Sequence, residues 1–387
     1  MIKLYHDTRI LYTVVFIVQI TRSMRETFVM THTHLWLRAE SKPQEQRTAL
    51  TPENTKQLLD AGFKVTIESS VQSIFAINDY EAVGASIAPE GSWVDAPEEA
   101  IILALKELPE ATFPLHHQHI YFAHAYKEQQ GWQALLSRFV SGKGELFDLE
   151  YLVDDNNRRI AAFGYWAGYA GAALGVLAWL KQQQNITPPL NNINSYANQE
   201  SLIAEINDLL ATCESKPKIL VIGAKGRSGS GAVALAKALS LETVEWDIAE
   251  TQKGGPFAEI LNMDILVNCV FINQDLPPFI TKEMLITEER TLSMIVDVSC
   301  DPYGSYNPLP IYNECTTFKS PCLSIIQGDK PLDMIAIDHL PSLLPKESSE
   351  DYGQQLVKHL LTLNDQSQGV WPKALSLFNE KTAEIKL

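Results

Sequence analysis

The chain is short of positive charge. Its 31 Lys and Arg residues are outnumbered by 47 Asp and Glu residues, which leaves a formal net charge of −16 at pH 7. Nucleic acid and anionic membrane surfaces would repel such a chain, so the sequence predicts neither as a partner. A small anionic ligand stays compatible with this charge, because a few local arginines can outweigh a distant net charge.

Cysteine is also scarce, and its distribution excludes two kinds of protein. No two cysteines form a CxxC pair and their number is odd, which argues against a disulfide framework and favours inert thiols in a reduced, cytoplasmic setting. The five residues are Cys213, Cys269, Cys300, Cys315 and Cys322.

Long apolar runs are nearly absent. The run "ILYTVVFIVQI" (10–20) is too short to span a bilayer, and no small-residue cleavage site follows it. We interpret residues 1–30 as a loosely packed N-terminal extension, with the genuine start of translation at Met24 or Met30. A targeting segment is the alternative.

A second run, 163–180, holds 18 residues without a charge. Its glycines recur at helical spacing, which gives one smooth face on which another backbone can lie closely. We therefore expect a buried helix between two domains rather than a membrane span. The glycines are Gly164, Gly168, Gly171 and Gly175.

From Leu35 onward, strand-like and helix-like segments alternate. Thr51 is placed to cap a helix that has Pro52 in its first turn and ends at Gly62, and "FKVTIE" then reads as a strand. Two more strands are expected at 101–105 and 119–123, followed by a helix near 128–140. Such alternation predicts an α/β fold with parallel sheets covered by helices on both faces.

A polar linking segment, 183–217, that turns helical precedes a second unit. This unit reads as a strand (218–222), a glycine-rich turn, a helix (231–240) and a strand that ends at Asp247. The order suits a dinucleotide, with the helix N-terminus for the pyrophosphate and the carboxylate for the ribose hydroxyls, and Asp247 favours NAD over NADP. The glycines stand at 223, 226, 229 and 231 and do not match GxGxxG, and the lysine of a P-loop is absent.

Lys106 and His124 each follow an apolar run, in "IILALKELPE" and "HIYFAHAYKE". The carboxyl ends of neighbouring parallel strands meet at one edge, so both side chains are expected to share a cleft. A lysine held neutral by burial and nearby positive charge acts as a general base, a histidine shuttles protons near pH 7, and Glu107 offers a partner. The alternative is a strand-end lysine that simply reaches water.

Other candidate ligands are less specific. Arg47 and the pair Arg158–Arg159 are suited to holding carboxylates, or are ordinary surface arginines. Four histidines lie in "LHHQHIYFAH", but their spacing matches no zinc pattern, so no metal is predicted.

Several longer segments carry a family resemblance. They are "LRAESKPQEQRTALTP", "LALKELPE", "FAHAYKEQQGW", "RRIAAFGYWAGYAGAALGV", "IGAKGRSGSGA", "WDIAETQKGGPF", "VDVSCDPYGSYNPLPIY" and "IDHLPSLLP". From about Leu35 to the C-terminus the chain resembles the NAD-dependent, L-lysine-forming saccharopine dehydrogenases, which belong to the alanine dehydrogenase-like two-domain superfamily.

The resemblance implies that saccharopine, NAD and water give L-lysine, 2-oxoglutarate and NADH. Lys106 matches the base that deprotonates the secondary amine, and His124 the acid/base that activates water on the imine. Substrate contacts map onto Arg47, Lys106, Gln129, Arg159, Phe163, Ser299, Cys300 and Asp301, with Glu107 and Glu150 tuning the site. Cofactor contacts map onto Arg158, Gly226, Arg227, Asp247, Thr251, Phe271, Val298, Ile337, Asp338, His339 and Leu340.

The resemblance also implies two Rossmann-like domains that flank a cleft. The expected substrate domain comprises residues 31–162 and 345–387, and the NAD domain residues 163–344. A monomer with small-molecule partners only is expected.

Three departures from the family pattern stand out. Phe271 takes the place of a common tyrosine, Ser228 takes the place of a cysteine that would pair with Cys269, and the N-terminal extension has no counterpart. An alanine-dehydrogenase-like oxidoreductase and a non-catalytic NAD-binding regulator stay open as alternatives.

Overall fold

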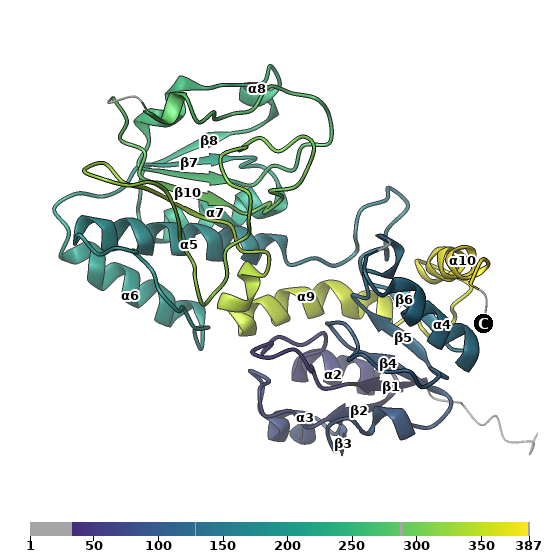
Figure 1. The fold of residues 1–387 in the computed structure, drawn as a ribbon. Helices are drawn as coiled ribbons and strands as arrows, with labels where there is room; N and C mark the ends of the chain where they lie inside the picture. Colours follow the sequence, from purple (N-terminus) through teal and green to yellow (C-terminus); the bar gives the residue numbers. More distant parts are fainter. Residues whose placement is uncertain (1–32, 128, 287–288, 386–387) are drawn as a thin grey trace, which may run out of the picture.

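The computed structural model describes residues 33–127, 129–286 and 289–385. The described chain forms two lobes, each built on a six-stranded sheet (Figure 1). The α/β class with two Rossmann-like, mainly parallel sheets is confirmed. The expected N-terminal extension, residues 1–30, lies outside the described residues.

The first sheet is wholly parallel, with the order β3-β2-β1-β4-β5-β6. The chain starts in the centre, winds outward to β3, then returns beside β1 and winds the other way to β6. Ligands of such sheets bind where the winding reverses, which is here at the carboxyl ends of β1 and β4. The strands are β1 (His34–Leu37), β2 (Lys64–Glu68), β3 (Ser86–Ala88), β4 (Ala100–Leu103), β5 (Gln118–Tyr121) and β6 (Glu145–Asp148).

Local signals set the helices of this lobe. Thr51 accepts a hydrogen bond from the amide of Asn54 and caps the first helix, and Gly62 follows its end with a φ of 89°, as the sequence predicted. The helices are α2 (Pro52–Asp60), α3 (Ile77–Ala82) and α4 (Trp132–Gly142), with 3₁₀ turns at Ser92–Asp95 and Ala125–Lys127.

The second sheet has the order β11-β12-β10-β9-β7-β8 and is parallel except for the β11–β12 pair. Its winding reverses between β7 and β9. The strands are β7 (Ile219–Ile222), β8 (Thr243–Trp246), β9 (Ile265–Asn268), β10 (Met294–Asp297), β11 (Leu323–Ile326) and β12 (Leu332–Ile335). Its helices are α5 (Gly164–Gln183), α6 (Gln199–Ala211), α7 (Arg227–Ala238) and α8 (Ile248–Thr251), with 3₁₀ turns at Ala258–Asn262, Met284–Ile286 and Leu340–Leu343.

Helix α5 is the predicted glycine-rich helix, and most of its residues from Gly168 onward are buried. A Cβ added at Gly168 would lie 1.7 Å from the carbonyl oxygen of Ser228, and one at Gly231 would lie 1.9 Å from that of Tyr165. Helices α5 and α7 therefore cross in backbone contact. The prediction of a buried helix is confirmed, and among the described residues no helix is long and apolar enough to cross a membrane.

The C-terminal helices α9 (Pro345–Leu360) and α10 (Trp371–Thr382) return to the first lobe. Tyr352 of α9 and Trp371 of α10 are buried in the core of the first sheet. Helix α9 also touches the second lobe, because Glu347 accepts a hydrogen bond from the amide of Gln199 at 2.5 Å. The exact domain boundaries stay a prediction.

Candidate active site

Lys106 and His124 lie three residues beyond the ends of two neighbouring strands, β4 and β5. Both expected strands end two residues earlier than predicted, and the second amide after each strand donates to a buried carboxylate instead of a neighbouring strand. The amide of Leu105 donates to Glu40 at 2.6 Å, and that of Ala123 donates to Asp148 at 3.3 Å. The chain thus leaves the sheet before it reaches either candidate side chain.

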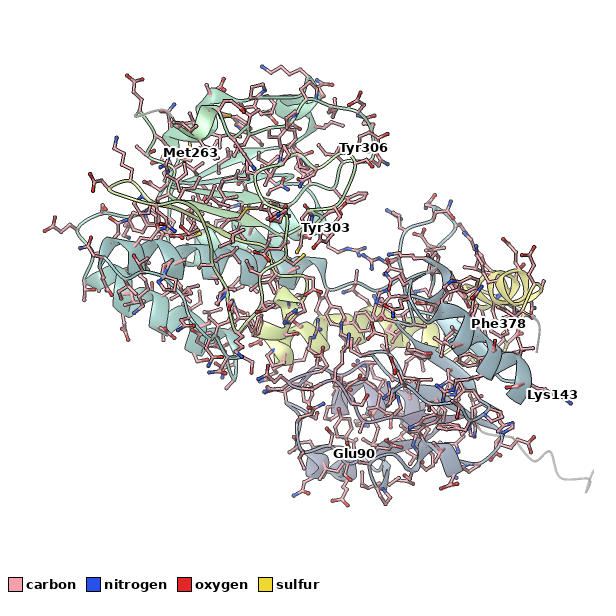
Figure 2. All side chains as sticks on the ribbon, in the orientation of Figure 1. Glu90, Lys143, Met263, Tyr303, Tyr306 and Phe378 are labelled. Atoms are coloured by element: carbon pink, nitrogen blue, oxygen red, sulfur yellow. The ribbon has the colours of Figure 1, made fainter. Side chains whose placement is uncertain are left out.

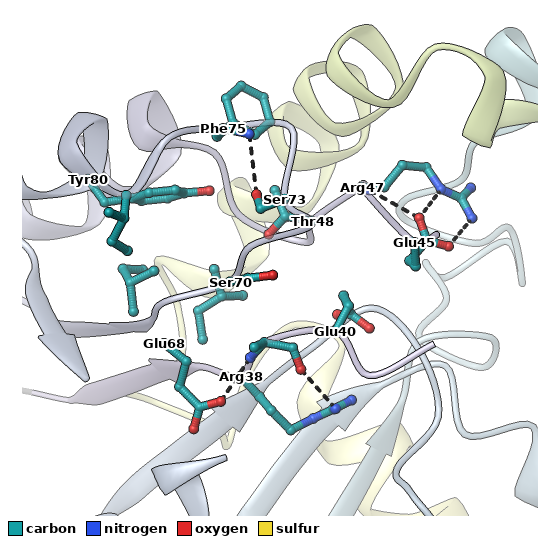
Figure 3. Close-up of a pocket in the computed structure, with 14 residues that line it drawn as sticks. Arg38, Glu40, Glu45, Arg47, Thr48, Glu68, Ser70, Ser73, Phe75 and Tyr80 are labelled. Carbon is teal, nitrogen blue, oxygen red and sulfur yellow. Dashed lines mark hydrogen bonds and ion pairs between the residues drawn. The ribbon is translucent and has the colours of Figure 1, made fainter. Parts of the chain in front are cut away.

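The backbone of Lys106 is held by two residues of the segment that follows β1. The buried carboxylate of Glu40 accepts its amide at 2.9 Å, and Arg38 donates from Nη2 to its carbonyl oxygen at 2.7 Å (Figure 3 shows both side chains). Sequence reasoning missed this pair. The available signal was "RAE" directly after an apolar strand, because charged residues buried at a strand end need specific partners.

The environment of Lys106 favours its neutral form. Burial lowers the pKa of this ammonium, and the positive charge of Arg47 lowers it further, while Glu45 and Glu107 act in the opposite direction. The net pKa is below its ordinary value. Burial and a nearby positive charge thus act in the direction that the sequence analysis expected, towards the neutral form.

Arg47 is buried beside Lys106 and already has a carboxylate partner, which the sequence prediction did not include. Its Nε and Nη2 donate to the two oxygens of Glu45 at 2.8 and 2.7 Å. Its guanidinium carbon lies 4.7 Å from the ring centre of Phe163, and that ring stacks on Tyr352 at 4.3 Å. The structure therefore brings two predicted substrate contacts, Arg47 and Phe163, together.

His124 adopts an unusual backbone conformation, with a φ of 52°. Its ring stacks on Phe122, with the two centres 6.0 Å apart, and its Nε2 lies 3.9 Å from Oε1 of Glu107. Burial lowers the pKa of His124, although Glu107 and Glu150 raise it, and Lys106 lowers it through its charge. The imidazole is thus neutral near pH 7 and electrostatically coupled to the lysine.

Glu107 makes no ion pair with Lys106, although the sequence suggested this neighbouring carboxylate as the partner of the lysine. Its carboxylate pairs with Lys42 at 2.9 Å and faces His124. It acts on Lys106 only through its charge.

A second group of charges centres on Glu150. This carboxylate pairs with Lys127 at 2.9 Å and with Arg159 at 2.7 Å. Burial raises the pKa of Glu150, but these cations outweigh burial and lower it overall. Arg158, by contrast, is exposed and pairs with Asp154 at 3.1 Å.

Besides a cavity of ≈ 630 Å³ that is lined by Glu150 and Arg159, two further cavities adjoin these residues. The one in Figure 3, lined by Arg38, Glu40, Glu45 and Arg47, holds only ≈ 30 Å³, which is too small for a ligand. The other opens beside His124 and Gln129 and has a volume of ≈ 700 Å³, within the range of small-molecule sites.

The glycine turn of the second lobe explains the irregular spacing. Gly223 has a φ of 80°, Gly226 precedes the first residue of α7, and a Cβ at Gly229 would lie 2.0 Å from the carbonyl oxygen of Gly223. These are the tight turn, the helix entry and the close helix–strand contact of a dinucleotide fingerprint, with one extra residue between the first two glycines. Gly231 instead serves the contact with α5.

Asp247 follows β8 and faces this turn. Its carboxylate accepts the amides of Ile248 and Lys225, each at 2.8 Å, and these bonds lower its pKa. Thr251 donates its hydroxyl to the carbonyl oxygen of Asp247 at 2.9 Å. An ionised carboxylate beside a helix N-terminus, with Arg227 as the first helical residue, fits a dinucleotide with free ribose hydroxyls.

The remaining predicted residues lie at the carboxyl edge of the second sheet. Val298 and Leu340 lie over Gly171 of α5. Ile337 is buried, Phe271 is 68% exposed, and His339 stacks on Phe318.

Ser299 and Asp338 also lie at this edge and interact with charged or polar neighbours. The hydroxyl of Ser299 donates to Asp297 at 2.6 Å. Hydrogen bonding to His339 lowers the pKa of Asp338, and the positive charge of Lys106 lowers it further. The segment after β12 therefore lies close enough to Lys106 of the other lobe for the lysine charge to affect the pKa of Asp338.

Comparisons with known proteins agree with this arrangement. Residues 36–170 match the family model "Alanine dehydrogenase/PNT, N-terminal domain". The chain is 50% identical over 367 residues to saccharopine dehydrogenase [NAD(+), L-lysine-forming] of Emericella nidulans, covering 91% of this chain and 98% of that protein. The enzyme of that name from Candida albicans is 49% identical, with coverages of 91% and 97%.

The fold is shared more widely. An L-alanine dehydrogenase structure superposes with a TM-score of 0.63 at 16% identity, covering 91% of this chain and all of that one. This likeness concerns the fold alone. Near 50% identity over almost the whole length of the fungal proteins is decisive: the chain belongs to the saccharopine dehydrogenase [NAD(+), L-lysine-forming] family.

Proposed function

We propose that the protein oxidises saccharopine with NAD and water to give L-lysine, 2-oxoglutarate and NADH. One observation carries the proposal: a buried lysine with a lowered pKa is coupled to a neutral histidine at the switch point of the first sheet. The fungal relatives are named for the same reaction class.

Lys106 is the general base for the first step. Oxidation of a secondary amine needs the lone pair of its nitrogen, so the proton of the substrate ammonium must leave first. A lowered pKa increases the fraction of Lys106 that is neutral and able to take this proton. NAD, when bound, supplies the acceptor for the hydride that leaves the adjacent carbon.

His124 then acts on the resulting imine of the substrate. As a neutral imidazole it removes a proton from water while that water attacks the imine carbon. As an imidazolium it returns a proton to the leaving nitrogen, and as the neutral imidazole it then takes the proton of the carbinolamine hydroxyl, so that the C–N bond breaks and lysine and 2-oxoglutarate form. The charges of Glu107 and Glu150 stabilise the imidazolium that this requires.

The three carboxylates of saccharopine account for the arginines of an acidic protein. Arg47 and Arg159 both bind carboxylates in this structure, namely those of Glu45 and Glu150, so a substrate carboxylate would displace or share these partners. The cavity beside His124 and Gln129 has the volume for the substrate. Phe163 with the segment Ser299, Cys300 and Asp301 would complete its walls.

We assign the cofactor to the edge of the second lobe. Gly226 and Arg227 would hold the pyrophosphate at the N-terminus of α7, and Asp247 would bind the ribose hydroxyls and repel the phosphate of NADP. Further contacts are proposed for Arg158, Thr251, Phe271, Val298, Ile337, Asp338, His339 and Leu340. We also propose a monomer in a reduced, cytoplasmic setting, with residues 31–162 and 345–387 as substrate domain and 163–344 as NAD domain.

The test is an absorbance assay of NADH release by the purified protein. Saccharopine with NAD is expected to give NADH and equimolar lysine, whereas alanine with NAD, and saccharopine with NADP, give at most a few per cent of that rate. Faster release from alanine would assign the protein to the alanine-dehydrogenase-like reaction. NAD binding without turnover of either substrate would support a non-catalytic regulator instead.

A further inference from the structure

Two cysteines come together at the edge of the second lobe. The sulfur of Cys300 lies 3.3 Å from that of Cys315, across a loop that separates the two residues by 15 positions. Both are free thiols in this structure. A disulfide has its sulfurs about 2.05 Å apart, so the bond needs an approach of only about 1.3 Å.

The backbone around both cysteines is anchored. Cys300 follows β10 and Ser299, whose hydroxyl is bonded to Asp297. Cys315 precedes Thr316, whose amide donates to the carbonyl oxygen of Ala336 at 2.7 Å. These hydrogen bonds fix the residue next to each cysteine, which limits how far the two backbones can move apart.

The loop between the two cysteines is open to solvent. Tyr303 and Tyr306 are 77% and 43% exposed, and Figure 2 shows both at the surface of the second lobe. Closing the bond would fix this loop next to the segment that carries Asp338. Burial and the contact with Cys315 raise the pKa of Cys300, and the negative charge of Asp338 adds a smaller increase.

We propose that Cys300 and Cys315 form a reversible dithiol–disulfide site, which fixes the loop 301–314 when oxidised by a small disulfide such as oxidised glutathione. This goes beyond the proposed catalytic function and does not depend on it. It also replaces, for Cys300 and Cys315, the expectation of inert thiols. The two residues are 15 positions apart in the sequence, and only the fold brings their sulfurs into contact.

The two cysteines have different parts in the exchange. Cys315 is exposed, so its thiolate attacks one sulfur of the small disulfide, whose S–S bond breaks and releases one small thiolate. Cys300 is partly buried, so it reacts second: it loses its proton, attacks the sulfur of Cys315 in the mixed disulfide and expels the second small thiolate. The two thiol protons end on the two released thiols. The protein has lost two electrons, and the small disulfide has gained them.

The sequence offers a clean measurement. Trypsin cleaves after Arg290 and Lys319, and the peptide 291–319 contains Cys300 and Cys315 but none of the other three cysteines. The full-length protein is equilibrated with oxidised and reduced glutathione, alkylated, digested without reductant and analysed by mass spectrometry. An internal disulfide appears as peptide 291–319 with two hydrogens fewer and no alkyl group.

In the wild type we expect this oxidised peptide to be at least about tenfold more abundant than oxidised forms of the peptides with Cys213, Cys269 or Cys322. Dithiothreitol should restore double alkylation. The Cys315→Ser variant should leave Cys300 alkylated, whereas the matched control Cys322→Ser should behave as the wild type. Double alkylation of the wild-type peptide throughout, or a glutathione adduct on Cys315 that never resolves, would overturn the proposal.

Discussion

The proposed mechanism requires Lys106 to be uncharged when it meets the substrate, and the neighbours of this residue influence the pH at which that happens. Burial and Arg47 lower its pKa, while Glu45 and Glu107 oppose them. The same Glu107 raises the pKa of His124. One carboxylate therefore raises the pKa of both proposed proton-transfer groups, against the larger effect of burial.

Glu107→Gln should move the pH profile of kcat/KM to lower pH. Removing the anion lowers the pKa of Lys106, and it frees the positive charge of Lys42, which acts in the same direction. The rise of activity that accompanies deprotonation of Lys106 should then occur at lower pH than in the wild type. The matched control is Glu98→Gln, an exposed carboxylate, and a profile equal for both variants would count against the electrostatic role.

Glu40 has a positioning role that needs a separate test. Its buried carboxylate accepts the amides of Leu105 and Lys106, and an orphaned buried amide costs about 1–3 kcal/mol. Glu40→Ala should lower the urea midpoint and kcat together, and Glu40→Gln, which keeps one acceptor oxygen, should lose less of both. Equal midpoints and equal kcat for Glu40→Ala and wild type would contradict this assignment.

At the scale of elements, the crossing of α5 and α7 depends on glycines. Gly168 and Gly231 stand where any side chain would meet a backbone carbonyl of the opposite helix. Phe163 is the residue before α5, and the glycine turn leads directly into α7, so this crossing lies next to predicted site residues of both ligands.

Gly231→Ala should destabilise the protein by about 3 kcal/mol, because its Cβ would force the two helices apart. The matched control is Ser230→Ala, an exposed neighbour on the same helix, which should change stability by less than about 1 kcal/mol. Denaturant unfolding of both variants decides the point. Similar free energies for the two would show that the helices have room to adjust.

Elements with strong local signals could be predicted from the sequence. The cap at Thr51, the strands before Lys106 and His124 and the buried helix α5 are all present, because each depends on residues close together in the chain. The start of α7 was placed four residues late. Glycines at 226, 229 and 231 read as a loop, whereas Gly226 caps the helix and Gly229 and Gly231 lie within it, where they contact the turn after β7 and helix α5.

The polar partners of the site could not be predicted in the same way. Arg38 and Glu40 bind the backbone of residue 106, more than 60 positions further along the chain. The thiols of Cys300 and Cys315 meet only because β10 and the segment before Thr316 end at one sheet edge. Residue types and their spacing do not indicate which residues far apart in the sequence will pair.

At the scale of the whole molecule, buried histidines make stability depend on pH. His119 is fully buried among the rings of Trp93, Tyr121 and Phe139, and burial places its pKa well below the ordinary value. The unfolded chain binds its proton below about pH 6.5, whereas the folded chain does not. This residue therefore costs stability increasingly as the pH falls. Asp148 acts in the opposite direction, because burial raises its pKa to about 6.

Comparing His119→Leu with the wild type isolates the contribution of His119 to the pH dependence of stability from the contributions of groups such as Asp148. The variant should gain stability over the wild type as the pH falls from 7 to 5, by up to about 1.4 kcal/mol for each pH unit below 6.5. Urea unfolding of both proteins across this range measures the difference. A difference that stays constant with pH would mean that the folded protein protonates His119 as readily as the unfolded chain.

Helices α9 and α5 connect the two lobes, and Glu347 of α9 bonds to Gln199 of the second lobe. The positive charge of Lys106 on the first lobe lowers the pKa of Asp338 on the second. This proximity is what the proposed chemistry requires, since the base of one lobe must face the cofactor of the other. Lys106 and His124 should therefore be needed for turnover but not for binding NAD.

The most direct test compares turnover with NAD affinity in Lys106→Met and His124→Gln, with the exposed residues Lys358→Met and His116→Gln as matched controls. We predict that each site variant loses about 10²-fold or more in saccharopine-dependent kcat, with the dissociation constant of NAD nearly unchanged and both controls equal to the wild type. Turnover near the wild-type value in both site variants would contradict the account.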